Sequence, residues 1–522
     1  MLYYGFEDEM LRKFFATIFF MMIVSLTGCG GGGGGDSAVN RTINEPASGW
    51  TIMVWLDADN NLESAAMQDL NEMEYGLYLA GLGDSAVTDK VKIIVQVDRY
   101  GSASSPYTGD NWSDTRRYII RPDSANITKW TSQRIDNDLG EINMGDAGNL
   151  RNFIDYCQEH FPAPNYALIL WNHGGGLRKK SSSSSISGES GISSISSLSK
   201  AICWDDTNGD DALYTGEITD VLTDIHSVDF LGFDACLMGM LEVAYEYRPG
   251  VTGKFGADAI SFSPANEQGD GWNYERILNR LKGSGTDTEG DVCYNADSLT
   301  ANQFATLVAK EYADDDSTYS DDKQTQTAVD NTKVVALKTA FDAFAVACKN
   351  SKTELESVRG SGTSVSTMHY FNETDTGTPS LGILPEWISR PFFDLYDFAE
   401  RMYNNNDIAD TAATNLMTAI NNFILYSYAG SSYSGFSNGQ NGLSFFFTDG
   451  DEIYSYSGVK HLAYQWWYTS VDSNIWWPGG HYYGKLDFCD GDNDSSVETW
   501  FELIMYMYHT GDYDNFHPGP AF

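Results

Sequence analysis

The segment YALILWNHGGG, residues 166–176, joins a short apolar run to a polar end and a glycine-rich turn. A continuous apolar run of this length is typical of a strand that is buried on both faces. Similar runs occur at 51–56, 91–97 and 228–233, with helical spacing between several of them. Strands that alternate with helices predict an α/β fold with a mostly parallel central sheet covered on both faces.

The remaining pattern extends this plan. A further edge strand is expected at 117–120 and another strand at 442–447, with helices over 62–79, 149–160, 297–313, 333–350, 391–403 and 411–426. The predicted regions are a leader over 1–29, a flexible tether over 30–48, an α/β core over 49–285 with a serine-rich insert at 178–200, a helical extension over 286–450 that returns to the core, and an aromatic-rich region over 451–522.

The N-terminus has the pattern of a secretory signal. A basic patch at 11–13 precedes the apolar run 14–24, which is short for a membrane span, and six glycines follow Cys29. Leu-Thr-Gly-Cys, ending at Cys29, resembles the lipobox of bacterial lipoproteins, which implies acylation of Cys29 and anchoring to a bacterial membrane outside the cytoplasm. That membrane would be the outer membrane, or the cell surface, in a cell with two membranes. An uncut membrane anchor is the alternative, and the acidic residues 7–9 favour translation from Met10.

Charge and cysteine content exclude several classes of protein. The formal net charge is −41, so a nucleic-acid partner is not expected. The chain has seven cysteines, with neither the spacing of a zinc site nor the density of a disulfide scaffold. Apart from Cys29, we expect most of them to be small buried residues and one to be a free nucleophile.

Two predicted strand ends carry groups that can do chemistry. His173 and Gly174 follow the strand at 166–171, and Cys236 follows the strand at 228–233. Sites in open α/β sheets form beyond the carboxyl ends of the strands, so these residues can meet. A histidine close to a cysteine favours the nucleophilic thiolate and can later protonate the leaving amine.

The segments YALILWNHGGG (166–176) and LGFDACLMGMLE (231–242) closely resemble the two signature segments of clostripain-type cysteine peptidases. The resemblance covers most of residues 50–280 and is thinner to about 470. It implies a caspase-like α/β/α sandwich with a C-terminal α+β extension. It also implies an endopeptidase in which Cys236 attacks the scissile carbonyl and His173 is the general acid and base.

The resemblance also assigns substrate-binding roles. The backbone N–H groups of Gly174 and Cys236 are candidates for the oxyanion hole. Asp234 matches the position that selects a basic P1 residue, so peptide or protein substrates with Arg, and secondarily Lys, are expected. Positions i and i+2 of an extended segment face the same way, which would bring Asp234 and Cys236 together. Trp272 and Glu267 are further candidates for the P1 pocket.

Self-cleavage is a second expectation from the family. Its members often mature by a cut between the histidine and cysteine motifs, and here that interval holds the basic residues Arg178, Lys179, Lys180 and Lys200. The alternative is a flexible loop whose charges only aid solubility.

The chemistry needs no cofactor, but some family members require calcium. Asp206, Asn208, Asp210 and Glu217 match positions 1, 3, 5 and 12 of an EF-hand loop, although Asp211 stands where a glycine is expected. The acidic segment 490–494 with Glu498 fits this spacing less well.

Two rival functions remain at this point. The sequence GFSNG at 435–439 fits the G-x-S-x-G motif of serine esterases, with residues 173–176 as an oxyanion loop. That motif requires a strand before it and a helix after it. The second rival is a non-catalytic surface lipoprotein that binds peptide or glycan on a degenerate peptidase scaffold.

Overall fold

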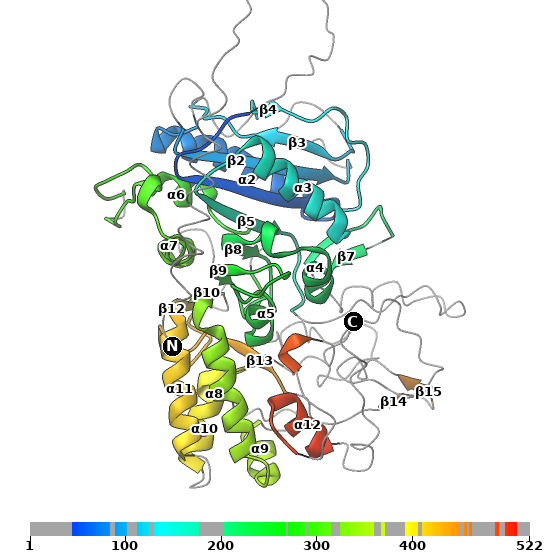
Figure 1. Cartoon of the computed structure of the whole chain (residues 1–522), viewed down its shortest axis with the longest axis vertical. Coiled ribbons are helices and arrows are strands. Elements are labelled where there is room, and N and C mark those ends of the chain that lie inside the picture. Colours follow the sequence, from blue (N-terminus) through cyan, green and yellow to red (C-terminus); the bar gives the residue numbers. More distant parts are fainter. Residues whose placement is uncertain are drawn as a thin grey trace, which may run out of the picture. The chain divides into compact units, whose positions relative to one another are not determined.

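The computed structural model describes residues 44–83, 89–101, 112–124, 130–176, 202–209, 211–267, 270–287, 290–314, 324–359, 367–370, 392–405, 410–447, 454–456, 459–461, 486–489 and 496–508. Within these residues, nine strands form one sheet in the order β12-β10-β9-β8-β5-β1-β2-β3-β4 (Figure 1). Their bounds are β1 Trp50–Ala58, β2 Val91–Arg99, β3 Arg116–Ile119, β4 Gln133–Arg134, β5 Asn165–Trp171, β8 Val228–Asp234, β9 Ala257–Phe262, β10 Thr325–Asp330 and β12 Ile424–Ala429.

The centre of the sheet is parallel. β9, β8, β5, β1 and β2 are joined by parallel pairing, whereas β10 and β12 at one edge and β3 and β4 at the other pair antiparallel. This confirms the predicted α/β fold with a mostly parallel central sheet. The carboxyl ends of the parallel strands lie along one edge, where a site is expected.

Helices cover both faces of the sheet. On one face lie α2 (Glu63–Ala80), α6 (Tyr274–Asn279) and α7 (Ala301–Asp314), and on the other lie α3 (Ala147–His160), α4 (Thr215–Val221), α5 (Leu241–Glu246) and α8 (Val334–Ala347). A hydrophobic core lies on each face of the sheet, and alternate residues of β1 pack into one or the other. Met53 and Trp55 pack on the face covered by α3, and Ile52 and Val54 pack on the face covered by α2. The central strands are therefore mainly apolar on both sides, because both faces of the sheet are buried.

The second half of the chain returns to this framework. α8 packs against α11 (Asp410–Phe423) and α12 (Trp500–Tyr508), and α10 (Leu395–Asn405) packs against α9 (Lys352–Arg359) and α11. In the described part of the whole chain, small antiparallel pairs also form between β6 (Ile202–Asp205) and β7 (Asp211–Leu213), β11 (Phe392–Asp394) and β13 (Ser444–Phe446), and β14 (Tyr454–Tyr456) and β15 (Val459–His461).

Two predicted helices were wrong at one end. The segment 391–403 begins as β11, and α10 begins only at Leu395, because the Asp394 carboxylate accepts from the backbone N–H of Asp397 at 2.8 Å. The segment 411–426 ends as β12, because its last residues pair with β10 instead of continuing α11. Tertiary pairing outweighs local helix propensity here.

Several predictions lie outside the described residues. They concern the leader with Cys29, the insert with Arg178, Lys179, Lys180 and Lys200, the acidic residue Asp210, and the segment 490–494. None of the helices in the described ranges is long and apolar enough to cross a membrane.

Candidate active site

The histidine and cysteine segments meet at the carboxyl ends of two neighbouring strands. β5 and β8 run parallel, with Trp171 opposite Asp234, so the chain leaves both strands at the same level. Contact is closest at Gly174, where an added Cβ would lie 2.0 Å from the carbonyl oxygen of Cys236 and 2.9 Å from its nitrogen. The two segments therefore touch backbone to backbone, although 63 positions (236 − 173) separate His173 from Cys236 in the sequence.

This contact predicts a large effect of Gly174→Ala. A methyl group cannot lie 2.0 Å from the Cys236 carbonyl oxygen, so the backbone on one side must move. We expect kcat/KM to fall by about 100-fold, since displacements near 1 Å at a reacting centre cost about that much. Overpacking should also lower the free energy of unfolding by about 1–3 kcal/mol. Peptidase assays and thermal denaturation test this, and unchanged activity would contradict the backbone contact.

Cys236 lies in a turn that aims a backbone N–H at its sulfur. β8 ends at Asp234, and Leu237 adopts a left-handed backbone with φ of 63° while donating to the carbonyl of Ala265 at 2.8 Å. The N–H of Glu267 donates to the Cys236 sulfur at 3.2 Å. A donor in this position stabilises negative charge on the sulfur, as a nucleophile requires.

The other described cysteines are poor nucleophiles. Cys157, Cys203, Cys293, Cys348 and Cys489 are buried and, like Cys236, form no disulfide within the described part of the chain. Burial raises the pKa of Cys157 and of Cys348 to about 12. The prediction of small buried cysteines is confirmed for these five residues, and Cys236 differs from them in being half-buried.

His173 contacts a residue that the sequence analysis did not single out. Its Nε2 lies 2.9 Å from Oδ1 of Asn61, in the turn between β1 and α2. With Nε2 protonated, the ring donates to this amide oxygen, which fixes the plane of the imidazole. The neighbouring Asn172 donates through Nδ2 to the Asp57 carboxylate at 2.7 Å, which secures the base of the histidine turn. Asn61 follows β1 at the same edge of the sheet at which His173 follows β5. Its place after a strand end is the feature of the sequence that could have identified it as a site residue.

Asp234 is buried beside the cysteine turn, with 4% of its surface exposed. Its carboxylate accepts from the hydroxyl of Tyr274 at 2.8 Å and from the backbone N–H of Trp272 at 3.2 Å. Burial raises the pKa of Asp234 to about 7, although these hydrogen bonds act in the opposite direction. Gly271 leaves room here, since a Cβ on it would lie 2.8 Å from an Asp234 oxygen.

Glu267 links Asp234 to Cys236. Its backbone N–H donates to the Cys236 sulfur at 3.2 Å, and its side chain is close enough to Asp234 to be affected by the charge of that carboxyl. Burial, and then the charge of Asp234, raise the pKa of Glu267 well above its usual range. The expected link through an extended i, i+2 pair does not apply, because β8 ends at Asp234 and Cys236 already lies in the turn. Asp234 and Cys236 are nevertheless connected, because Glu267 lies next to both.

Trp272 contributes its backbone more than its ring to this region. The indole is 1% exposed and packs against Gly232 of β8, where an added Cβ would lie 2.7 Å from the ring. With the Gln326 amide in the orientation that its neighbours require, the indole N–H donates to it at 3.2 Å and the amide donates to Glu267 at 2.8 Å. A direct role for the ring in substrate binding stays a prediction.

The EF-hand-like segment is divided between two places. Asn208 donates to Asp205 and to Glu141, both at 3.2 Å, and the backbone N–H of Asp206 donates to the carbonyl of Asp59. Glu217 is in the first turn of α4, where burial and the charges of Asp211 and Asp146 raise its pKa to about 7. With Asp210 outside the described residues, calcium binding by the complete set stays a prediction.

The esterase motif does not form a nucleophile elbow. Residues 435–439 lie in an irregular loop that follows β12, and the next regular element is the short strand β13, not a helix. The glycines at 174–176 lie against the cysteine turn instead, with Gly176 3.0 Å (from its added Cβ) from the Leu237 carbonyl oxygen. The serine esterase hypothesis is therefore rejected.

Comparison with known proteins agrees with this geometry. Residues 54–500 match the model of the clostripain family of peptidases. The chain belongs to the clostripain family. It is 38% identical over 491 residues to clostripain of Hathewaya histolytica, covering 87% of this chain and 86% of that protein. As a member of the clostripain family it is a cysteine endopeptidase acting on peptide or protein substrates, and thiol catalysis needs no cofactor for the bond cleavage.

A solved structure supports the fold of this clostripain-family chain. It is a secreted cysteine protease from Bacteroides thetaiotaomicron in complex with an irreversible peptide inhibitor. The TM-score is 0.50 at 18% sequence identity, with 77% of this chain and 93% of that chain covered. The predicted membership of the family and its α/β fold are both confirmed.

Proposed function

We propose that Cys236 and His173 form the catalytic pair of an endopeptidase that cleaves after basic residues. The Cys236 sulfur attacks the scissile carbonyl carbon, and the proton from the thiol passes through His173 to the leaving amine. The product of this step is a thioester on Cys236 together with the released C-terminal peptide. Water then attacks the thioester, with His173 accepting its proton, and the thiol is regenerated with the N-terminal acid product.

The oxyanion hole would be formed by the N–H groups of Gly174 and Cys236. These residues are in backbone contact, with the added Cβ of Gly174 2.9 Å from the Cys236 nitrogen. Two backbone donors close to the attacking sulfur can stabilise the developing negative charge without reorganisation. The absence of a side chain at Gly174 is what allows this approach.

The observation that carries the basic specificity is a buried acidic cluster without a basic partner. Asp69, Asp234 and Glu267 are buried, and burial is the main cause that raises the pKa of each; the charge of Asp234 adds to the effect on Glu267 and, after that of Glu72, on Asp69. None of the described Lys, Arg or His residues forms an ion pair with these three carboxyls. Such carboxyls are held protonated or matched by an external cation. A guanidinium or ammonium at P1 would supply that positive charge, with Asp234 as its partner. Arg is favoured, because its planar fork suits a carboxylate.

The raised pKa of Asp234 predicts that KM for Arg substrates depends on pH. Because this pKa is about 7 and not near 3.8, the carboxyl is mostly neutral at low pH and ionised at high pH. A cationic P1 residue binds the ionised form, so KM should fall by about 30-fold between pH 5.5 and 8.5. Alkylation of Cys236 by iodoacetamide over the same range separates the nucleophile from the pocket. A KM that is constant with pH would count against Asp234.

Maturation and location are further parts of the proposal. We infer self-cleavage at one of the basic residues between the two catalytic motifs, because a cationic segment tethered beside an Arg-selective site has a high local concentration.

Acylation of Cys29 would hold the enzyme on an extracytoplasmic membrane face. Labelling with a radioactive fatty acid, with Cys29→Ser as the control, tests the anchor: equal labelling of both proteins, or of neither, would contradict it.

The specificity is tested with the chain from Ser48 onward and fluorogenic peptides that have Arg, Lys or Asp at P1. Cleavage after Arg, with or without Lys, is the expected result. Preference for Asp would exclude the proposed pocket.

A further inference from the structure

A buried amide lies between the nucleophile and the proposed P1 pocket. It belongs to Gln326, the second residue of β10, which is 0% exposed. Gln326 is on the same face of the strand as Ala328, which packs in the apolar core that also contains Trp272. Burial of an amide in such a core costs free energy unless the amide is hydrogen-bonded. Packing alone therefore does not explain a glutamine at this position.

The Gln326 amide forms all four hydrogen bonds that a primary amide can form. With its oxygen and nitrogen placed as the neighbouring groups require, the nitrogen donates to Oε1 of Glu267 at 2.8 Å and to the carbonyl of Thr325 at 3.3 Å. The oxygen accepts from the indole N–H of Trp272 and from the hydroxyl of Ser261, both at 3.2 Å. Because both N–H groups and both acceptor positions are used, the side chain is held in one orientation.

One of these hydrogen bonds leads to the nucleophile. Glu267, whose side chain contacts Gln326, donates its backbone N–H to the Cys236 sulfur at 3.2 Å. The loop after β9 that carries Glu267 is also attached to Thr325, whose hydroxyl accepts from the backbone N–H of Ala265 at 3.0 Å. The start of β10 therefore holds this loop at two points, and a hydrogen-bonded network of this kind keeps the Glu267 N–H directed at the sulfur.

A second hydrogen bond leads to the carboxylate of the P1 pocket. The indole of Trp272 donates to Gln326, and the backbone N–H of Trp272 donates to the Asp234 carboxylate at 3.2 Å. Fixing the ring helps to fix this backbone donor, and with it the direction in which the carboxylate faces. A bidentate pair with a guanidinium depends on that direction, whereas an ammonium group, which acts as a point charge, depends on it less.

We propose that Gln326 is a positioning residue that connects the nucleophile with the P1 pocket. It acts through Glu267 on one side and through Trp272 on the other, and takes no part in bond cleavage itself. The inference rests on the proposed roles of Cys236 and Asp234. It adds to them a residue that follows the nucleophile by 90 positions (326 − 236). Loss of the Gln326 amide should lower both the reactivity of the thiol and the preference for Arg.

The test compares Gln326→Met with Thr327→Val in the parent chain. Methionine is similar in volume to glutamine but has no amide, so it removes the four hydrogen bonds without leaving a large cavity. Thr327 is the next residue of β10, and its hydroxyl donates to the Gly442 carbonyl at 2.7 Å on the other face of the strand. Thr327→Val thus removes a buried hydrogen bond from the same strand and leaves the bonds of Gln326 in place. Thermal denaturation shows that both variants are folded.

Two measurements report on the two ends of the network. Alkylation of Cys236 by iodoacetamide, without peptide, should be about 10-fold slower in Gln326→Met, since a hydrogen bond to a charged group contributes at least that much. In the peptide assay, kcat/KM for Arg substrates should fall by about 100-fold. That for Lys substrates should fall less, so the Arg-to-Lys ratio decreases by about fivefold. Thr327→Val should match the parent within about twofold in the alkylation rate and in the ratio.

Equal alkylation rates and equal Arg-to-Lys ratios in Gln326→Met and Thr327→Val would overturn the proposal. If Gln326→Met does not fold, Ser261→Ala replaces it. Loss of the one hydrogen bond from Ser261 should slow alkylation of Cys236 by about threefold, and a rate equal to that of the parent would overturn the proposal.

The parent chain distinguishes this inference from the proposed function. Equal cleavage after Arg and Asp by the parent would show that the proposed function is wrong. The alkylation comparison needs no substrate, so it decides the role of Gln326 in either case.

Discussion

Replacement of Cys236 by alanine is expected to lower kcat/KM on Arg peptides by a factor of about 10⁴ or more, to the level of the blank. The reason is that the thioester cannot form, and no other described cysteine can replace it: burial raises the pKa of Cys157 and Cys348 to about 12. The measurement compares the purified variant with the parent chain at equal concentration.

The matched control is Cys293→Ala, which removes a buried thiol in the loop after α6 and should leave kcat/KM within about twofold.

The same Cys236→Ala chain tests self-processing. The parent should separate into two fragments by a cut within 178–200, while the variant stays intact. Equal cutting of both proteins at the same position would show that an outside peptidase is responsible.

The second large effect is expected for Asp234→Asn. An amide keeps the hydrogen bonds from Tyr274 and the Trp272 backbone but cannot match a guanidinium. Loss of one partner of a buried charge pair costs about 2–5 kcal/mol, which corresponds to about 30- to 5,000-fold in kcat/KM for Arg substrates. The rate of Cys236 alkylation should change little, because that sulfur contacts Glu267 and not the Asp234 carboxyl.

Stability provides the check that Asp234→Asn is folded. The pKa of Asp234 is raised on folding, so the native state binds more protons than the unfolded state between about pH 4 and 7. Stability from this group therefore falls as pH rises through that range, and the amide removes the penalty. The variant should have a Tm at pH 8 that is no lower than that of the parent. Asp258→Asn, exposed on β9, should behave like the parent in both assays. Full activity of Asp234→Asn on Arg peptides would exclude Asp234 as the P1 partner.

The parallel strands could be predicted because each is buried on both faces and therefore contains a mainly apolar run. The runs at 51–56, 91–97, 166–171 and 228–233 all lie within strands of the sheet. The antiparallel edge was harder. β10 has the sequence TQTAVD, and its polar residues can be buried because they form hydrogen bonds. Thr327, for example, donates to the Gly442 carbonyl at 2.7 Å. Burial of that kind leaves no apolar pattern in the sequence.

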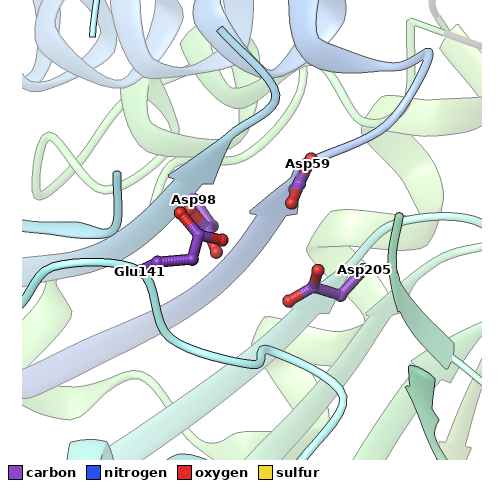
Figure 2. A group of neighbouring side chains, drawn as sticks. All are labelled: Asp59, Asp98, Glu141 and Asp205. Carbon is purple, nitrogen blue, oxygen red and sulfur yellow. The ribbon is translucent and has the colours of Figure 1, made fainter. Parts of the chain in front are cut away.

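The catalytic pair and the group of four carboxylates also differ in how readily the sequence reveals them. His173 and Cys236 each follow an apolar strand, so the strand-end rule found them. By contrast, Asp59, Asp98, Glu141 and Asp205, whose carboxylate oxygens lie within 4.8 Å of one another (Figure 2), are spread over a long stretch of sequence. Spacing within a single loop directed attention to residues 206–217 instead, although Asp59 and Asp98 are also at strand ends. Their convergence depends on the parallel register of β1 with β2, in which Asp57 lies opposite Asp98.

The central claim, that Cys236 is the nucleophile of a site selective for basic residues, is tested most directly by covalent labelling. The parent chain is treated with matched thiol-reactive peptide ketones that have Arg, Lys or Asp at P1, and the adduct is located by mass spectrometry of the digested protein. The account predicts one adduct, on Cys236, formed fastest by the Arg probe and not by the Asp probe. An adduct on any other residue, or equal labelling by the Arg and Asp probes, would contradict it.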